Sequence, residues 1–149
     1  MKRDFLDAVV SDLVRYRDCW VCQHCGKSFV PPNAGYHCSH FKSRAHKGTR
    51  WDLKNLDGLC WGCHKYFGSH LTEYREWKVA RIGEQAVTLL EYQARHIFKL
   101  SMSEKELLYQ QMKAKLNEFK ENWQSRLNVL NDPGSGGAIP LASKPAKSF

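Results

Sequence analysis

The hydrophobic pattern near the start of the chain has the spacing of an amphipathic helix. Apolar residues recur there at intervals that place them on one helical face. They are Phe5, Leu6, Val9, Val10, Leu13 and Val14. The pattern predicts a first helix from about Asp4 to about Tyr16, with this face buried in a core.

Short apolar and aromatic runs follow on either side of turn-forming residues. The segment 31–35 predicts a turn, and the run from Tyr36 to Phe41 is short and aromatic enough for a strand. A further run from Leu56 to Cys60 leads directly into a helix predicted over 61–70. The middle of the chain is therefore expected to combine extended segments with a helix.

The second half of the chain has helical periodicity over residues 71–81, 83–95 and 103–130. The last of these predicted helices has a marked start. Ser103 and Glu106 have the spacing of a capping box, in which each side chain bonds to the backbone amide of the other residue.

Large apolar residues form one stripe along the predicted 103–130 helix, at Leu108, Met112, Leu116, Phe119, Trp123, Leu127 and Leu130. Their steps of 4, 4, 3, 4, 4 and 3 give an 11-residue period, which indicates a near-straight helix and not a left-handed coiled coil. We expect the stripe to dock on an identical subunit and form a homodimer. The alternative is that the helix folds back onto the core of its own chain.

The composition is that of one small domain of mixed class. The chain has 149 residues, of which 42% are hydrophobic and 26% are charged, enough for one compact core. The predicted organisation is an α+β domain over 1–70, a helical extension over 71–130, and a disordered tail over 131–149 that is rich in Gly, Pro, Ser and Ala.

The charge balance indicates a polyanionic partner. Lysine and arginine number 23 against 15 acidic residues, so the formal net charge is +8, which favours nucleic acid. No apolar run approaches the roughly 20 residues that cross a bilayer, and Asp4 and Asp7 are unlike the basic start of a signal peptide. The sequence thus favours a cytoplasmic protein with no membrane partner.

Six cysteines in such a protein indicate metal binding more than disulfides. Cys22 and Cys25 form one C-x-x-C pair, and Cys60 and Cys63 form another. Two such pairs are typical of a structural Zn²⁺ site with four thiolates. Cys19 could replace one ligand, since Cys19 and Cys22 also have this spacing, but the glycine after Cys25 favours the first assignment. We expect Cys19 and Cys38 to be small buried residues.

The residues between and after these pairs resemble a known nuclease motif. His40, Asn55 and the string LCWGCH, which ends at His64, resemble the HNH nucleases. A wider resemblance, from about Asp12 to about Asn122, is to the phage recombination endonuclease family called NinG or Rap. It rests on the segments CQHCGKSF, SHFKSRAHKGTRWDLKN, LCWGCHKYFGSHLTEYR and RIGEQAV, and the fold and zinc are also similar to those of endonuclease VII.

The resemblance implies a small zinc-bound ββα-metal domain, in which a two-stranded hairpin and a helix hold one catalytic ion. It implies that His40 is the general base and His64 a ligand of that ion. Asn55 would brace the loop that orients the base. The family's activity is cleavage of branched DNA such as D-loops and Holliday junctions, leaving a 5′-phosphate and a 3′-hydroxyl.

One position departs from the motif. Many HNH enzymes have an aspartate before the base histidine as a second metal ligand, whereas this chain has Ser39. His37 and His70 are the candidate replacements, and His37 is favoured because it lies three positions from His40. The expected catalytic ion is Mg²⁺ or Mn²⁺, in a phage or prophage protein.

Six basic residues surround the motif and are predicted to contact DNA phosphates, namely Lys42, Arg44, Lys47, Arg50, Lys54 and Lys65. We expect Trp51, Trp61 and Trp77 to lie in the core. The predicted function is metal-dependent cleavage of branched DNA. The alternatives are an HNH nuclease that cuts linear duplex in packaging or restriction, and a zinc module that binds DNA without cutting it.

Overall fold

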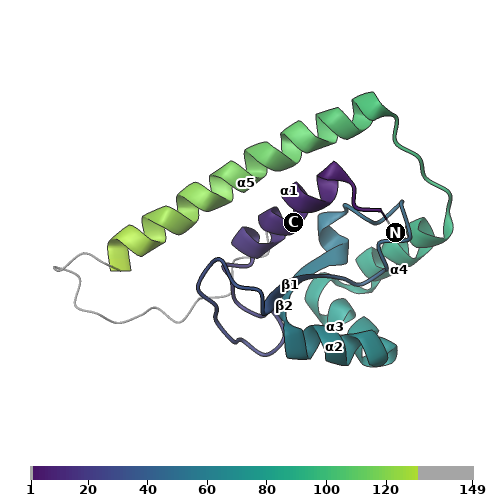
Figure 1. Cartoon of the computed structure of the whole chain (residues 1–149). Helices are drawn as coiled ribbons and strands as arrows, with labels where there is room; N and C mark the ends of the chain where they lie inside the picture. The colour runs from purple at the N-terminus through teal and green to yellow at the C-terminus, as the bar shows by residue number, and fades with distance from the viewer. Residues whose placement is uncertain (1, 131–149) are drawn as a thin grey trace.

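The computed structural model describes residues 2–130, which form a mostly helical fold around a small two-stranded sheet (Figure 1). The elements are α1 (Phe5–Arg17), β1 (Tyr36–His40), the short 3-10 helix η1 (Leu53–Asn55), β2 (Leu56–Cys60), α2 (Trp61–Ser69), α3 (Leu71–Ile82), α4 (Glu84–Arg95) and α5 (Met102–Leu130). The mixed class expected from the sequence is confirmed. The predicted tail lies outside the described residues. No helix within residues 2–130 is long and apolar enough to span a membrane.

The first helix is fixed at its start by a capping box. The Asp4 side chain accepts a hydrogen bond from the Leu6 amide, and the Asp7 carboxylate accepts one from the Asp4 amide at 2.8 Å. These contacts satisfy amides that the first helical turn cannot pair. The predicted apolar face is buried, with Leu6, Leu13 and Val14 fully excluded from solvent.

The sheet consists of β1 and β2, which pair antiparallel with Tyr36 opposite Cys60 and His40 opposite Leu56. Gly58 stands in the centre of β2 because no side chain fits there: a Cβ would lie 1.9 Å from the Tyr36 hydroxyl. A buried ion pair joins β2 to α3, where Lys78 Nζ lies 2.6 Å from an Asp57 oxygen. The hairpin is thus held on the helical layer by an ion pair as well as by packing.

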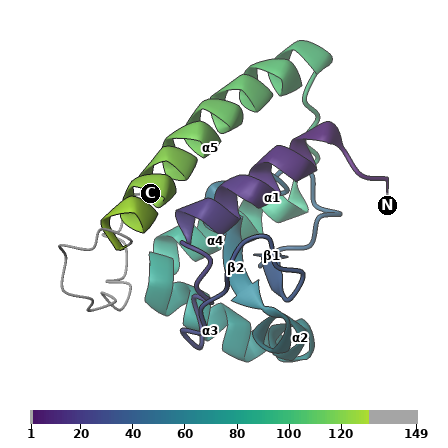
Figure 2. The ribbon, with the colours of Figure 1, turned by 60° about the vertical axis from the view of Figure 1, so that its left-hand side comes forward.

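Two apolar clusters hold the elements together on opposite sides of the sheet. In Figures 1 and 2, α1 and α5 lie on one side, and α2, α3 and α4 lie on the other. The first cluster joins the α1 stripe to Trp51, Leu56, Met112 and Leu116. The second cluster includes Phe41, Leu59, Phe67, Tyr74, Val87 and Leu90. Each cluster therefore draws residues from both 1–70 and 71–130.

The long helix α5 runs alongside α1, in the same direction, over the length of α1 (Figure 2). Phe5 packs on Tyr109 near one end, and Tyr16 packs edge-on against Trp123 near the other. Met112 and Leu116, at the centre of the stripe, are buried. The centre of the stripe is therefore covered by the same chain, as in the alternative stated above, whereas Leu130 at its end is 43% exposed. The homodimer stays a prediction.

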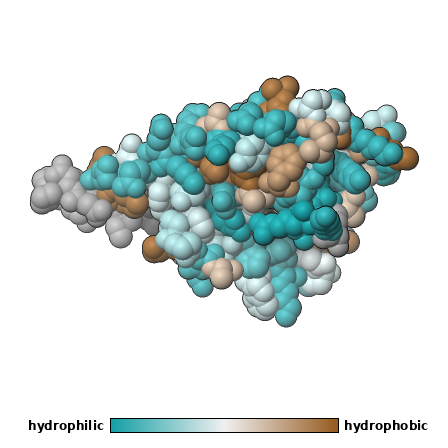
Figure 3. All heavy atoms as spheres, turned by 45° about the horizontal axis from the view of Figure 1, so that its top comes forward, coloured by the Kyte–Doolittle hydropathy of each residue, from teal (hydrophilic) through white to brown (hydrophobic). Residues whose placement is uncertain are grey.

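Helix α5 begins one residue before its predicted start, and its capping box lies two residues earlier than predicted. Ser101 and Glu104 make the reciprocal bonds of the capping box, since the Ser101 hydroxyl accepts from the Glu104 amide and Glu104 accepts from the Ser101 amide. Ser103 and Glu106 have the same spacing, and the prediction that they form the box is wrong. The solvent side of α5 is largely hydrophilic (Figure 3), as expected for a helix that buries one face.

Candidate functional site

Four cysteine sulfurs meet at the end of the hairpin. The Sγ atoms of Cys22, Cys25, Cys60 and Cys63 all lie within 4.8 Å of one another. The 3.7 Å between the Cys25 and Cys60 sulfurs is close to the roughly 3.8 Å edge of a tetrahedron with Zn–S bonds of about 2.3 Å. The four residues chosen from the sequence thus fit one zinc ion.

Local backbone geometry positions each pair. Between Cys22 and Cys25 the chain turns tightly, the Gly26 amide donates to the Cys22 carbonyl, and Gly26 adopts a φ of +78° that favours glycine. Cys60 ends β2 and caps α2, and its sulfur accepts from the Cys63 amide at 3.4 Å. Amides directed at sulfur are typical of zinc sites with thiolate ligands.

The acidities of these thiols depend on one another. Burial opposes ionisation of Cys60, but the Cys63 amide and neighbouring thiols outweigh it and lower its pKa. Burial and the neighbouring thiols raise the pKa of Cys63. Since the thiolate is the form that binds metal, proton loss and metal binding are linked at this centre.

The two remaining cysteines lie outside the cysteine centre, and one histidine contacts it. Cys38 packs against the first cluster, and burial raises its pKa to about 12. Cys19 lies elsewhere, with its sulfur 3.0 Å from an Arg126 guanidinium nitrogen. His24 lies at the centre itself, with Nδ1 3.3 Å from the Cys63 sulfur and its ring against Phe67. In the sequence, only the position of His24 between Cys22 and Cys25 indicated that it would contact this centre.

A cavity of about 550 Å³ lies between α1, β1, the loop after β1 and the start of α2. His37, His40 and His64 all line it, although they come from two elements. The rings of His37 and His64 are 5.1 Å apart between centroids. The structure therefore brings together in one cavity the three histidines that the sequence predicted to lie together.

The surroundings of His40 favour a neutral imidazole. Burial, with the positive charge of Arg44, lowers its pKa to about 4, and a hydrogen bond with the Arg50 backbone acts in the opposite direction. Burial and the nearby His37 also lower the pKa of His64. Neutral imidazoles can accept a proton or ligate a metal ion, and charged imidazolium groups can do neither.

Asn55 is fully buried and holds the loop that follows His40. Its Oδ1 accepts from the Lys42 amide at 2.7 Å, and its Nδ2 donates to the carbonyls of Lys42 and Thr49. All the hydrogen bonds of this amide thus go to the backbone of the loop, which is the bracing contact expected from the sequence.

Ser39 and His70 do not join the histidines. Ser39 is buried, and its hydroxyl lies 3.1 Å from the Tyr74 hydroxyl on α3. His70 stacks on Tyr66 with ring centroids 4.0 Å apart and does not line the cavity. Of the two candidate replacements for the missing aspartate, the structure therefore brings only His37 beside His64.

A comparison with known families places the chain. It matches the family described as Bacteriophage Lambda NinG protein over residues 3–122. The chain belongs to the NinG family. No curated protein and no solved structure matches it. The NinG match includes the four clustered cysteines, the three cavity histidines and Asn55.

The predicted DNA contacts of this NinG chain fall into separate groups. Arg44 lines the histidine cavity, and Lys65 lies on the exposed side of α2 over the Trp61 ring. Lys42 is ion-paired with Glu91 at 3.2 Å. Lys47 and Lys54 line a second cavity, beside α5.

Arg50 requires a correction. Its side chain is 6% exposed, and its guanidinium is bonded to both oxygens of Asp7. Trp51 donates to the same carboxylate at 2.9 Å. Arg50 therefore fastens the loop to α1, and its guanidinium is not an open phosphate contact.

Several residues that line the histidine cavity were not predicted from the sequence. Arg3, Ser11 and Arg15 reach it from the start of the chain and from α1, and Ser43 reaches it from the loop. Trp61 was expected in the core but is 57% exposed, whereas Trp51 is buried as expected. Ser11 and Arg15 are four positions apart, and this spacing was the available sign of a polar face on α1.

Proposed function

We propose that this NinG-family chain is a metal-dependent endonuclease that cuts branched DNA. The observation that carries the proposal is the meeting of His37, His40 and His64 in one cavity lined by cationic side chains. The antiparallel hairpin followed by α2 also has the order of the ββα-metal motif. The match to a bacteriophage protein family supports the phage origin that the resemblance implies.

His40 is the proposed general base. Its low pKa keeps it neutral near pH 7, so a ring nitrogen accepts the proton of the attacking water. The new bond joins the water oxygen to phosphorus, the bond to the 3′ oxygen breaks, and this oxygen takes up a proton from solvent water. The products are a 5′-phosphate and a 3′-hydroxyl. Asn55 keeps the adjacent loop in place, so the base holds its orientation.

His64 and His37 would hold the divalent ion, Mg²⁺ or Mn²⁺. When bound, such an ion offsets the negative charge that develops on the phosphate and the leaving oxygen. Cys22, Cys25, Cys60 and Cys63 would hold a separate structural Zn²⁺. Since Cys63 directly precedes His64, this zinc would also fix the helix that carries the proposed metal ligand.

The rim of the cavity is suited to a DNA backbone. Arg3, Arg15 and Arg44 supply positive charge without a sequence-specific pattern. Trp61, three positions before His64 on α2, offers an exposed ring with Lys65 Nζ 5.0 Å from its centroid. Aromatic rings beside cations are common contacts for unpaired bases.

The proposal is tested by incubating the full chain with Mg²⁺ or Mn²⁺ and matched linear, forked, D-loop and four-way DNA. We expect branched substrates to be cut, and His40→Ala to reduce the rate about 10²- to 10⁴-fold with binding and zinc content retained. His96→Ala is the matched control, since that exposed side chain bonds to the Tyr92 carbonyl outside the cavity.

Three results would contradict the proposal or a part of it. Tight binding without cleavage of any substrate would support a non-catalytic zinc module. Equal cleavage of linear and branched DNA would support an ordinary HNH nuclease. Undiminished cleavage by His40→Ala would reject the assigned base.

A further inference from the structure

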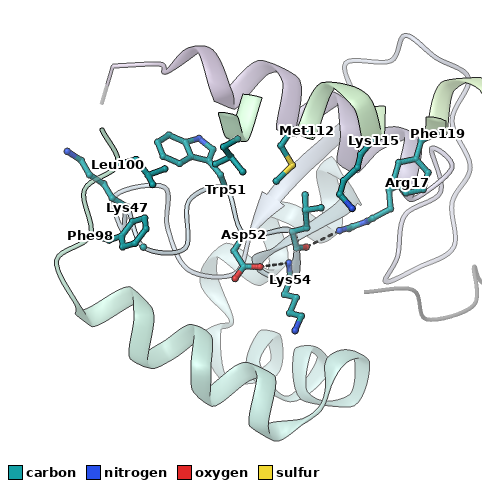
Figure 4. Close-up of a pocket in the computed structure, with 13 residues that line it drawn as sticks. Arg17, Lys47, Trp51, Asp52, Lys54, Phe98, Leu100, Met112, Lys115 and Phe119 are labelled. Carbon is teal, nitrogen blue, oxygen red and sulfur yellow. Dashed lines mark hydrogen bonds between the residues drawn. The ribbon is translucent and has the colours of Figure 1, made fainter. Parts of the chain in front are cut away.

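A second cavity lies on the other side of Trp51 from the histidines. It has a volume of about 540 Å³ and forms a groove between α5 and the 47–54 segment (Figure 4). Its wall is mainly apolar, with Phe98 and Leu100 from the connection between α4 and α5, and Met112 and Phe119 from α5.

The groove has cations along its length. In Figure 4, Lys47 lies beside Phe98 toward one end, Lys115 lies beside Phe119 toward the other, and Lys54 lies between them. All three lysines are exposed, and none is ion-paired within residues 2–130. The apolar wall of the groove therefore lies between unpaired cations. Such a surface suits a ligand that carries flat apolar groups on a negatively charged backbone.

The acidic residue and the arginine of the groove are already engaged. Asp52 Oδ1 accepts a hydrogen bond from the Lys54 amide, and Arg17 donates to the Leu53 carbonyl. Gly48 allows the loop to approach α4, because a Cβ there would lie 2.6 Å from the Gln93 carbonyl oxygen. These contacts fix the shape of the groove and leave the lysine ammonium groups available to bind a ligand.

We propose that this groove binds a single DNA strand, with bases against the apolar wall and phosphates on the three lysines. This inference rests on the proposed function and names the part of the branched substrate that the chain would recognise, the unpaired strand. Proteins that bind single strands combine a cationic groove with apolar or aromatic platforms for the bases. A lipid-like anion would satisfy only one lysine, whereas a strand offers a phosphate to each.

The test is binding of a fluorescein-labelled thymidine oligonucleotide of about ten residues, within the usual site size of such grooves. Fluorescence anisotropy is measured with the full-length His40→Ala chain, so that no cutting occurs. We expect Lys115→Glu to weaken binding about tenfold and to flatten its salt dependence. Lys113→Glu is the matched control, because it makes the same charge change on α5 outside the groove.

A second pair of variants tests the apolar wall. Phe98→Ala should weaken binding of the oligonucleotide by about fivefold or more, as expected from the loss of base stacking. Ile97→Ala should change it less than about twofold, since Ile97 is 93% exposed and outside the groove. Thermal unfolding of all four variants shows whether the fold is retained.

The outcomes separate this inference from the proposed function. If the wild-type chain cuts branched DNA but Lys115→Glu and Phe98→Ala bind the oligonucleotide normally, the groove assignment is wrong. If these variants weaken binding to linear duplex as much as to the single strand, the groove is a general DNA contact and the inference also fails. If no DNA is cut but groove variants selectively lose single-strand binding, the inference stands and the nuclease proposal fails.

Discussion

The imidazole of His40 lies half-buried beside Arg44, and this environment sets its protonation. In the unfolded chain the His40 imidazole has its ordinary pKa of about 6.5, whereas in the folded chain its pKa is about 4. The folded state therefore binds fewer protons between these values. His40 lowers the stability of the protein as the pH falls through this window, and has no such effect above it.

We expect NMR to detect this low pKa directly. The ring-proton shifts of His40 should remain constant from about pH 8 to about pH 5 in the zinc-loaded protein, because less than about a tenth of the group is protonated there. A His40→Gln spectrum assigns the resonance. A titration midpoint near 6.5 would show that burial does not control this group.

The buried Asn55 side chain makes three hydrogen bonds to the loop backbone. Asn55→Asp keeps an acceptor but removes both donors. The Lys42 carbonyl then loses its bond to this side chain, the Thr49 carbonyl keeps only the bond from the Asp52 amide, and a carboxylate is buried in place of a neutral amide. We expect the free energy of unfolding in urea to fall by about 2–4 kcal/mol. Asn33→Asp is the control, because the exposed Asn33 uses its side chain only as an acceptor, from the Gly35 amide. Equal midpoints would reject the bracing role.

At the scale of elements, the contact between α1 and α5 closes one side of the fold. Met112 is 9% exposed within it, whereas Leu107 on the same helix is 62% exposed. Met112→Ala should lower the free energy of unfolding by about 2–4 kcal/mol through the lost burial and the cavity left behind. Leu107→Ala should change it by less than about 0.5 kcal/mol. Far-UV circular dichroism in urea measures both, and similar values would mean that α5 does not pack as described.

The elements themselves follow closely from local sequence. The apolar period of α1 and the positions of α2, α3 and α4 were predicted to within about one or two residues at each end, because helical periodicity is a local property. The capping box of α5 was placed two residues late, since both serine–glutamate pairs have the required spacing. Spacing alone does not say which of two equivalent pairs begins the helix.

At the scale of the whole molecule, the cysteine centre ties the loop after α1 to the junction of β2 and α2. We expect one zinc ion per chain, measured by elemental analysis. Cys60→Ser should lose that ion and the cooperative unfolding transition, because the free energy of zinc binding is part of the free energy of folding. Cys19→Ser should keep both, since Cys19 lies outside the cluster. A folded, reduced preparation without zinc would contradict this prediction.

The sequence by itself determined the features that depend on spacing along the chain. The C-x-x-C pairs identified the four clustered sulfurs, and the motif identified His40, Asn55 and His64. His37 was favoured as a further ligand by its spacing from His40. In each case the residues stand at fixed spacings along the chain. A turn, strand or helix then places their side chains at fixed positions relative to one another.

Only the tertiary structure decided which surfaces those residues share. It buried Arg50 against Asp7, exposed Trp61, and covered the centre of the α5 stripe with α1. It also divided four of the six predicted phosphate contacts between two cavities and left Lys42 and Lys65 outside both. These outcomes depend on packing between segments far apart in the sequence. The local sequence around a basic or apolar residue does not show what that residue will contact. Its partner can be a carboxylate on α1, another helix or a bound ligand.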